Sequence, residues 1–444
     1  MKVGGLRWVA ALAILAGLAG LAVDPALAQE AAKATLDKGD TAWMLTSTIL
    51  VLLMIVPGLA LFYGGLVRTK NMLSLLTQVL AVTCVVTLLW ALYGYSFAFT
   101  NGTPFYGSAD KIFLRGIAPD TLSDIVKTIP EYVFVFFQMT FAAITTALVL
   151  GGVVERVKFF AVLLFAVLWM TFVYVPIAHM VWGGDGFLAA MGAKDFAGGT
   201  VVHINSGVAA LVGALIVGKR VGHGKEAMPP HSLTLTMVGG VLLWVGWFGF
   251  NAGSAGAADG VAALAMANTF VATAAAGLSW MVLEWMAKGK PSLLGLISGV
   301  IAGLVAVTPA AGLIGPMGAI ILGLVGGAVA LFFCTTVKSA LGYDESLDVF
   351  GIHCMAGIVG SILTGVLISQ DLGGVGVVVD GKDTYSMASQ VITQITAVGV
   401  AILWSAVGTA IIFSILKVIG LRPASDQERE GLDLVDHGER AYNY

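Results

Sequence analysis

The stretch Thr200-Val-Val-His-Ile-Asn-Ser-Gly-Val-Ala-Ala-Leu-Val-Gly-Ala-Leu-Ile-Val217 is apolar along most of its length, yet it carries His203. An apolar run of about 20 residues is long enough to cross a bilayer as a helix. A second such run, residues 347–369, carries His353, and in both runs a glycine follows the histidine four residues later. Because an ionisable side chain at membrane depth is costly, it usually marks a substrate, ion or proton path. The two histidines therefore indicate one site built from two halves of the chain.

The composition is that of an integral membrane protein. Hydrophobic residues make up 58% of the 444 residues and charged residues 11%, whereas soluble proteins average about 25% charged residues. The net charge of -3 gives no indication of nucleic-acid binding. The apolar runs are continuous rather than alternating, which favours helices over membrane strands. We predict an all-α protein with eleven transmembrane helices, over residues 42–66, 73–100, 131–153, 158–182, 198–218, 233–252, 260–286, 292–309, 313–336, 347–369 and 389–418.

The N-terminal residues are typical of a cleaved secretory signal. Lys2 and Arg7 form a basic start, an apolar segment follows, and Ala26-Leu-Ala28 resembles a cleavage site. An uncleaved first helix is the alternative interpretation. The expected organisation is a signal peptide over residues 1–28, an eleven-helix membrane domain over 29–418 and a cytoplasmic tail over 419–444.

Basic residues gather in alternate loops, and basic loops favour the cytoplasm. This asymmetry places the N-terminus outside and the C-terminus in the cytoplasm. The protein is expected to span the lipid bilayer of the inner (plasma) membrane. Helices one to five and six to ten then form an inverted repeat, with the last helix extra. Such a repeat brings equivalent positions together near the midplane. However, the two histidines lie near opposite sides of the membrane, so helix tilt or an earlier helix start has to bring them together.

Small residues recur at four-residue spacing in the eighth and ninth predicted helices. Residues at this spacing let helix backbones approach closely in lipid, which favours tight packing within one subunit over a direct role in a pore. The glycines concerned are Gly295, Gly299, Gly303, Gly323 and Gly327.

Two other classes of protein would also use buried histidines. One is an electron-transfer protein in which His203 and His353 are axial ligands of a haem. The other is a metal-dependent membrane hydrolase, but a catalytic zinc needs three protein ligands, and Cys354 points about 100° away from His353 on a helix. We interpret Cys84, Cys334 and Cys354 as small buried side chains rather than as disulfides or metal ligands.

Four segments and the tail together resemble the ammonium transporter family. The segments are Asp195-Phe-Ala-Gly-Gly-Thr-Val-Val-His203-Ile-Asn205, Trp247-Phe-Gly-Phe-Asn-Ala-Gly-Ser254, Phe137-Gln-Met-Thr-Phe141-Ala and Phe350-Gly-Ile-His353, followed in the tail by Gly420-Leu-Arg422 and His437-Gly-Glu439. The resemblance covers the whole mature chain in order. It implies the eleven-helix inverted repeat, assembly as a homotrimer with one pore in each subunit, and conduction of ammonium without an enzymatic reaction, a metal or a cofactor.

The resemblance also assigns roles to particular residues. Trp182, Phe141 and Ser254 would recruit ammonium on the outer side, partly through cation–π attraction. Phe141 and Phe250 would form a hydrophobic gate, and His203, His353 and Trp247 would line the pore beneath it. Ammonium would lose its proton near the outer site, ammonia would cross, and the proton would be regained inside.

Two carboxylates and two further histidines receive structural interpretations. Asp195 at the outer start of helix five would cap free backbone N–H groups, and Asp348 before His353 would do the same. His179 and His231, near helix ends, are expected to lie at the membrane interface.

The tail is polar and acidic, so a solvated disordered segment is the default expectation. The resemblance implies instead a tail that folds across neighbouring subunits and helps to bind a PII-type nitrogen-signalling protein. Pro423 departs from the family pattern, which leaves the local geometry of the tail open. Two related functions, an ammonia or carbon dioxide gas channel and an ammonium sensor, share this fold. Sensors usually carry an added cytoplasmic signalling domain, for which 26 tail residues leave no room.

Overall fold

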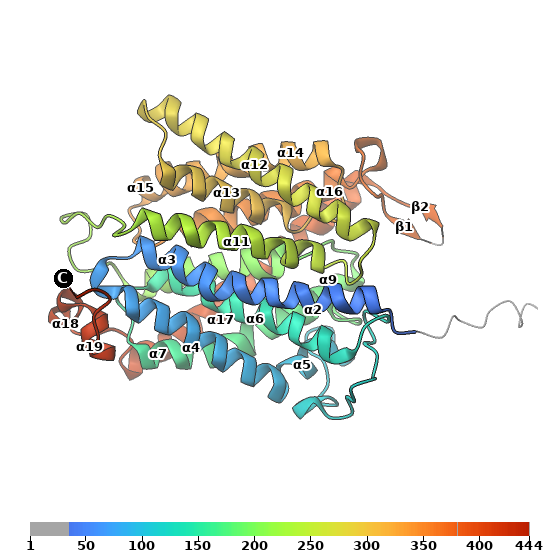
Figure 1. Ribbon diagram of the computed structural model, residues 1–444, viewed down its shortest axis with the longest axis horizontal. Helices are drawn as coiled ribbons and strands as arrows, with labels where there is room; N and C mark the ends of the chain where they lie inside the picture. Colours follow the sequence, from blue (N-terminus) through green and yellow to red (C-terminus); the bar gives the residue numbers. More distant parts are fainter. Residues whose placement is uncertain (1–34, 380, 444) are drawn as a thin grey trace, which may run out of the picture.

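A computed structural model describes residues 35–379 and 381–443 of the chain. The signal predicted over residues 1–28 lies outside these residues. The described chain is almost entirely helical, with helices packed side by side in one bundle (Figure 1). Its helices and strands are α2 (Lys38–Leu53), α3 (Ala60–Leu66), α4 (Met72–Leu89), α5 (Tyr95–Phe99), α6 (Glu131–Val153), α7 (Phe159–Trp169), α8 (Val175–Trp182), α9 (Phe187–Ala190), α10 (Asn205–Val217), α11 (Leu233–Gly253), α12 (Gly260–Lys288), α13 (Leu293–Val307), α14 (Pro316–Phe332), α15 (Lys338–Leu341), α16 (Ala356–Leu367), β1 (Val378–Val379), β2 (Lys382–Asp383), α17 (Met387–Ile419), α18 (Ser425–Glu430) and α19 (Leu432–His437).

Several helices join end to end through wider, π-helical turns to form the membrane spans. These turns are Met54–Leu59, Trp90–Gly94, Met170–Tyr174, Gly199–Ile204, Phe333–Val337 and Phe350–Met355, and short 3₁₀ turns lie at Thr69–Asn71, Ile112–Leu114 and Gln370–Leu372. Among the described residues, ten continuous helical stretches are long and apolar enough to cross a membrane. The other predicted helix is α13, whose 15 residues extend over about 22 Å at 1.5 Å per residue. The prediction of an all-helical membrane protein is therefore confirmed.

Different elements lie at the two ends of the bundle. The start of α2 and the β1–β2 hairpin lie at one end, and α18 and α19 lie at the other (Figure 1). Because the basic loops predicted to face the cytoplasm lie at the end that holds α18 and α19, we call this end the inner side.

The glycine pattern of the eighth and ninth predicted helices corresponds to close helix contacts. A Cβ atom added at Gly303 or Gly323 would overlap the carbonyl oxygen of Ala272 on α12. α12, α13 and α14 therefore approach backbone to backbone, as the small-residue spacing predicted.

The tail is folded, so the expectation of a disordered tail was wrong. α18 and α19 pack on the inner ends of the spans, where their carboxylates accept hydrogen bonds from helix starts. Asp433 accepts from the backbone N of Ser74 on α4 (2.8 Å), and Asp436 accepts from the backbone N of Phe159 on α7 (3.1 Å). A carboxylate at a helix N-terminus satisfies a free N–H group and complements the helix dipole. These long-range contacts hold the tail on the membrane domain.

Candidate functional site

The two histidines meet inside the bundle. His203 lies in the turn Gly199–Ile204 that precedes α10, and His353 lies in the turn Phe350–Met355 that precedes α16. Their Nδ1 atoms are 3.2 Å apart, and the rings are stacked at 28° with centroids 5.3 Å apart. The side chains are 0% and 4% exposed. This contact leaves no room for an iron and a porphyrin between the rings, which argues against the haem interpretation.

The histidines do not meet through an earlier helix start, which was one of the two expected ways. His203 is only the fifth residue of its helical stretch, and His353 is only the fourth. Both helices therefore begin inside the bundle, and mostly buried, non-helical segments carry the chain to these starts. The equivalent placement of the two histidines is consistent with an inverted repeat.

Asp195 organises the start of the His203 helix. Its two carboxylate oxygens accept hydrogen bonds from the backbone N atoms of Gly198, Gly199, Thr200 and Val201, at 2.6–3.1 Å. Burial raises the pKa of Asp195 above its usual value, and these four N–H groups oppose the shift. Its carboxylate is occupied by the backbone, which leaves little of it for contact with a cation.

The equivalent role on the His353 helix belongs to Glu345, so the assignment of Asp348 was wrong. Glu345 accepts a hydrogen bond from the backbone N of Phe350 (2.9 Å) and is fully buried. Burial raises the pKa of Glu345 to about 8, with nearby Lys338 opposing the shift. Asp348 has a left-handed backbone conformation (φ 61°), and its carboxylate pairs with Lys338. The sequence did contain the signal, because a second carboxylate precedes His353 within the same loop.

On the outer side of the histidines, two phenylalanine rings close the path. Phe141 on α6 and Phe250 on α11 stack with centroids 4.1 Å apart and ring planes at 19°. Both side chains are fully buried. The ring of Phe250 lies 5.9 Å from that of His203, and the ring of Phe141 lies 5.8 Å from that of Trp182. The aromatic rings thus form a continuous series from the outer side to the histidines.

A cavity of about 160 Å³ lies on the outer side, beside this stack, and is lined by Trp182, Phe137, Gln138 and Ser254, among others. The Trp182 indole donates to the backbone oxygen of Asp195 (2.9 Å), which fixes the ring, and the Ser254 hydroxyl donates to the Phe250 backbone oxygen (2.8 Å). Sequence reasoning gave Gln138 no role, although it lies within a family motif.

Buried polar atoms without a hydrogen-bond partner within residues 35–379 and 381–443 include Oε1 of Gln138 and Nε2 of His203. An unsatisfied buried polar atom is costly. Each is therefore available to a polar guest on the path between the outer cavity and the histidines.

Trp247 forms the wall beside His203. The two rings are stacked with centroids 5.3 Å apart, and the indole donates to the hydroxyl of Thr308, the residue that follows α13 (2.9 Å). The Thr308 hydroxyl in turn lies 3.3 Å from the side-chain oxygen of Asn251. Thr308, which the sequence gave no reason to select, thus holds the Trp247 ring nearly parallel to the imidazole.

Phe62 on α3 separates two spaces on the inner side of His353. A void of about 10 Å³ is lined by Phe62, His353, Trp247 and apolar side chains. A larger cavity of about 330 Å³, also lined by Phe62, opens below it. Phe62 is therefore the inner boundary of the apolar path, a role that the sequence analysis did not assign.

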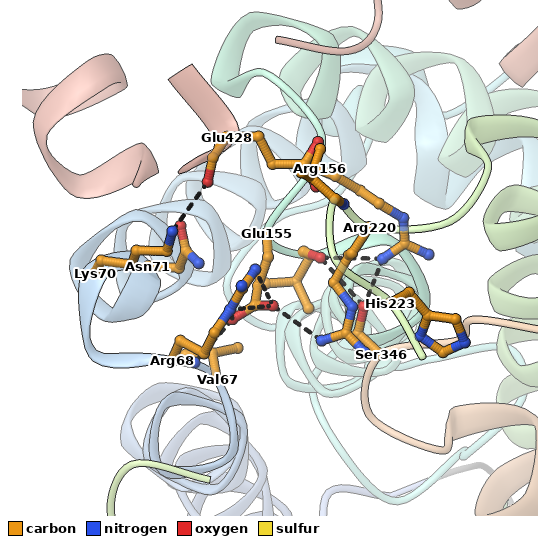
Figure 2. Close-up of polar contacts among 12 residues, drawn as sticks. Val67, Arg68, Lys70, Asn71, Glu155, Arg156, Arg220, His223, Ser346 and Glu428 are labelled. Carbon is orange, nitrogen blue, oxygen red and sulfur yellow. Dashed lines mark hydrogen bonds and ion pairs between the residues drawn. The ribbon is translucent and has the colours of Figure 1, made fainter. Parts of the chain in front are cut away.

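Charged side chains surround the inner cavity. Figure 2 shows Glu155 between Arg68 and Arg220, with ion-pair distances of 3.0 and 2.9 Å. Burial would raise the pKa of Glu155, but Arg220 and Arg68 outweigh this effect and keep the pKa below its usual value. Glu428 of α18 joins the same region by accepting from the backbone N of Val221 (2.6 Å). The tail is thus connected to the rim of the cavity.

Comparisons with known proteins identify the family of this chain. The model of the Ammonium Transporter Family matches residues 42–442. The chain is similar to an ammonium transporter of Aquifex aeolicus (49% identity, 93% of this chain and 95% of that protein) and to one of Bacillus subtilis (45% identity, 91% and 98%). Among solved structures it is similar to Saccharomyces cerevisiae Mep2 (38% identity, TM-score 0.80, 88% of this chain and 90% of that chain) and to a Sensor Amt Protein (26% identity, TM-score 0.82, 90% and 98%). With this much of its length matched, the chain is a multi-pass membrane protein that belongs to the ammonium transporter family.

Proposed function

We propose that this transporter recruits ammonium in the outer cavity and conducts it as ammonia past the two histidines to the inner side. The observation that carries the proposal is the series of spaces and rings: an outer aromatic cavity, a closed phenylalanine pair, two histidines in contact and an apolar void. A hydrated ion does not fit this path, whereas a small neutral molecule with one lone pair needs little space.

Recruitment would use the faces of Trp182 and Phe141. An ammonium ion over an aromatic face gains about 1–2 kcal/mol when it is partly desolvated. The Ser254 hydroxyl oxygen keeps a lone pair that accepts from the ion. The unpartnered Oε1 of Gln138 on the same cavity offers a further acceptor. Sodium, which has no N–H group, makes none of these directed hydrogen bonds.

The stacked Phe141 and Phe250 would then exclude charge. Closely packed apolar rings bar hydrated ions by keeping water out of a constriction. Ammonia passes such a barrier by displacing the rings slightly, whereas ammonium would have to shed its remaining shell. Deprotonation on the outer side of the rings therefore lowers the barrier.

The histidine pair suits a neutral guest that both donates and accepts hydrogen bonds. A neutral imidazole carries a single N–H group. When one Nδ1 donates to the other, the donor ring is left with a bare Nε2 and the acceptor ring with a protonated Nε2. The pair thus offers one acceptor and one donor to the path, and ammonia complements both.

The test compares recruitment with conduction in proteoliposomes. Trp182→Leu is expected to raise the ammonium concentration that gives half-maximal transport about tenfold, because it removes about 1–2 kcal/mol of cation attraction. The maximal rate should change much less. Ammonium-evoked current and internal pH are recorded on the same vesicles, so that charge movement is separated from ammonia flux.

Two outcomes of this comparison count against the proposal. An unchanged half-maximal concentration in Trp182→Leu would refute the recruitment site. Sodium currents through the wild type as large as the ammonium currents would refute the apolar barrier.

We also propose that three copies assemble, each with its own path. Large apolar side chains remain exposed on α12 and α14, among them Phe270, Met286 and Ile321. Lipid alone would cover such faces, but helices of a neighbouring subunit match them equally well. Native mass spectrometry of the detergent-extracted protein gives the number of copies.

The inner cavity and the docked tail support a further proposal, that a PII-type signalling protein binds the inner side. The cavity of about 330 Å³ is open to this side, and the tail contacts its rim through Glu428. A loop inserted into the cavity would block transport. Inhibition of transport by an added PII-type protein is the measurement that checks this.

A further inference from the structure

His179 on α8 was expected at the membrane interface, but it is fully buried. Both of its ring nitrogens face oxygen atoms. Nδ1 lies 3.0 Å from the backbone oxygen of Ala98, and Nε2 lies 2.8 Å from the backbone oxygen of Thr103. A neutral imidazole has one N–H group and one bare nitrogen, so it satisfies one of these carbonyls and places a lone pair against the other. Only the imidazolium donates to both.

A carboxylate accompanies the ring. Oδ1 of Asp185 lies 3.2 Å from Nε2 of His179 and has no hydrogen bond to any other group in the described part of the chain. Its other oxygen accepts from the backbone N of Gly102 (2.6 Å). An enclosed carboxylate oxygen without a donor is costly unless a positive charge lies beside it. Asp185 is also the one charged side chain within ion-pair distance of the ring among the residues that the structure covers.

The turn after α8 is built around this pair. The backbone N of Gly183 donates to the backbone oxygen of His179 (2.8 Å). A Cβ atom at Gly183 would lie 2.6 Å from Nδ1 of His179, and one at Gly186 would overlap the His179 backbone oxygen. Only glycine therefore lets this turn fold back onto the imidazole. The backbone N of Phe187 donates to the backbone oxygen of Pro104 (2.9 Å), so two outer loops join at this point.

We propose that His179, as an imidazolium paired with Asp185, is a positioning residue for the outer recruitment site. Trp182 lies three residues after His179, at the last position of α8, and its indole bonds to Asp195 on the far side of the same loop. The indole bond thus joins the two ends of the loop from Trp182 to Asp195, and the ion pair braces the first residues of this loop. The pair holds the ring of Trp182 against Phe141, and Asp185 neutralises a positive charge that would otherwise repel ammonium. This inference rests on the recruitment role proposed above.

The kinetic test uses Asp185→Asn, because Asp185 is 35% exposed at its side chain and the amide keeps its shape. Loss of the charge-assisted contact is expected to raise the half-maximal ammonium concentration about fivefold, with the maximal rate within about twofold of the wild type. Asp185→Glu, which keeps the charge, should recover most of the effect. Asp120→Asn removes an exposed outer carboxylate and is the matched control for net charge.

The spectroscopic test observes the ring itself. In protein labelled with ¹⁵N-histidine, one of the six histidines should show two protonated ring nitrogens at neutral pH, and this signal should be absent in His179→Gln. The double variant His179→Gln/Asp185→Asn should raise the half-maximal concentration no further than the stronger single variant.

The outcomes separate this inference from the recruitment proposal. If Trp182→Leu raises the half-maximal concentration and Asp185→Asn does not, only the role of His179 and Asp185 is overturned. The same holds if Asp120→Asn matches Asp185→Asn, or if the histidine signal is that of a neutral ring. If His179→Gln fails to fold, Asp185→Asn and the spectrum of the wild type still decide.

Discussion

Replacement of His203 by alanine is expected to reduce ammonium transport by about 10- to 100-fold while the half-maximal ammonium concentration stays close to that of the wild type. The imidazole provides Nε2, an enclosed atom that finds no partner in the described residues, and its Nδ1 contacts His353. Its loss removes a hydrogen-bonding position from the path and leaves Nδ1 of His353 unpaired, a cost of about 1–3 kcal/mol. This cost raises the free-energy barrier to crossing and leaves the affinity of the outer site unchanged.

The measurement is the initial rate of ammonium-evoked current and of internal pH change in proteoliposomes of equal protein content. His223→Ala, which removes a histidine from an inner loop outside the path, is the control. A His203→Ala variant that retains its melting temperature and transports at the wild-type rate would show that the imidazole pair is not on the path. A large rise in half-maximal concentration would instead assign His203 to recruitment.

The predictable parts of this fold were those set by local composition. Each long apolar run appears as a helix, because membrane spans follow from hydropathy within one segment. The glycine spacing in α13 and α14 equally predicted the close packing of these helices. The pairing of His203 with His353 was also inferred, because two ionisable residues in apolar runs need a common explanation.

The parts that were not predictable depend on contacts between distant segments. Whether Glu345 or Asp348 caps the His353 helix is decided by the left-handed turn at Asp348 and by Lys338, which draws the Asp348 carboxylate away. Phe62 and Thr308 gain their positions from α3 and α13, which approach the pore from other parts of the chain. No periodicity within either segment distinguishes these residues from ordinary core residues.

The tail shows the same limitation. Its acidic composition is typical of a disordered segment, yet Asp433 and Asp436 find the N-terminal ends of α4 and α7. A carboxylate gains this stabilisation only where a helix start lies nearby. Composition alone therefore overestimated disorder.

Asp195→Ala is expected to be the most destabilising single substitution near the site. The Asp195 carboxylate accepts four backbone hydrogen bonds at the start of the His203 helix. Without it, these buried N–H groups lose their acceptor, and the cost is about 3 kcal/mol or more, since each unsatisfied donor costs about 1–3 kcal/mol. The apparent melting temperature of the purified protein should fall by on the order of 5 °C.

Asp195→Asn distinguishes a capping role from direct attraction of the cation. The amide keeps one acceptor oxygen but places an NH₂ group against two backbone donors, so it should lose about half of the stability that Asp195→Ala loses. Asp371→Ala, at an exposed carboxylate in the turn Gln370–Leu372 that precedes β1, should leave the melting temperature unchanged. If Asp195→Asn melts like the wild type but needs far more ammonium for half-maximal transport, the carboxylate acts on the ion. If stability falls and the half-maximal concentration of the remaining folded protein does not change, the function of Asp195 is to begin the His203 helix inside the bundle, where the two imidazoles can meet.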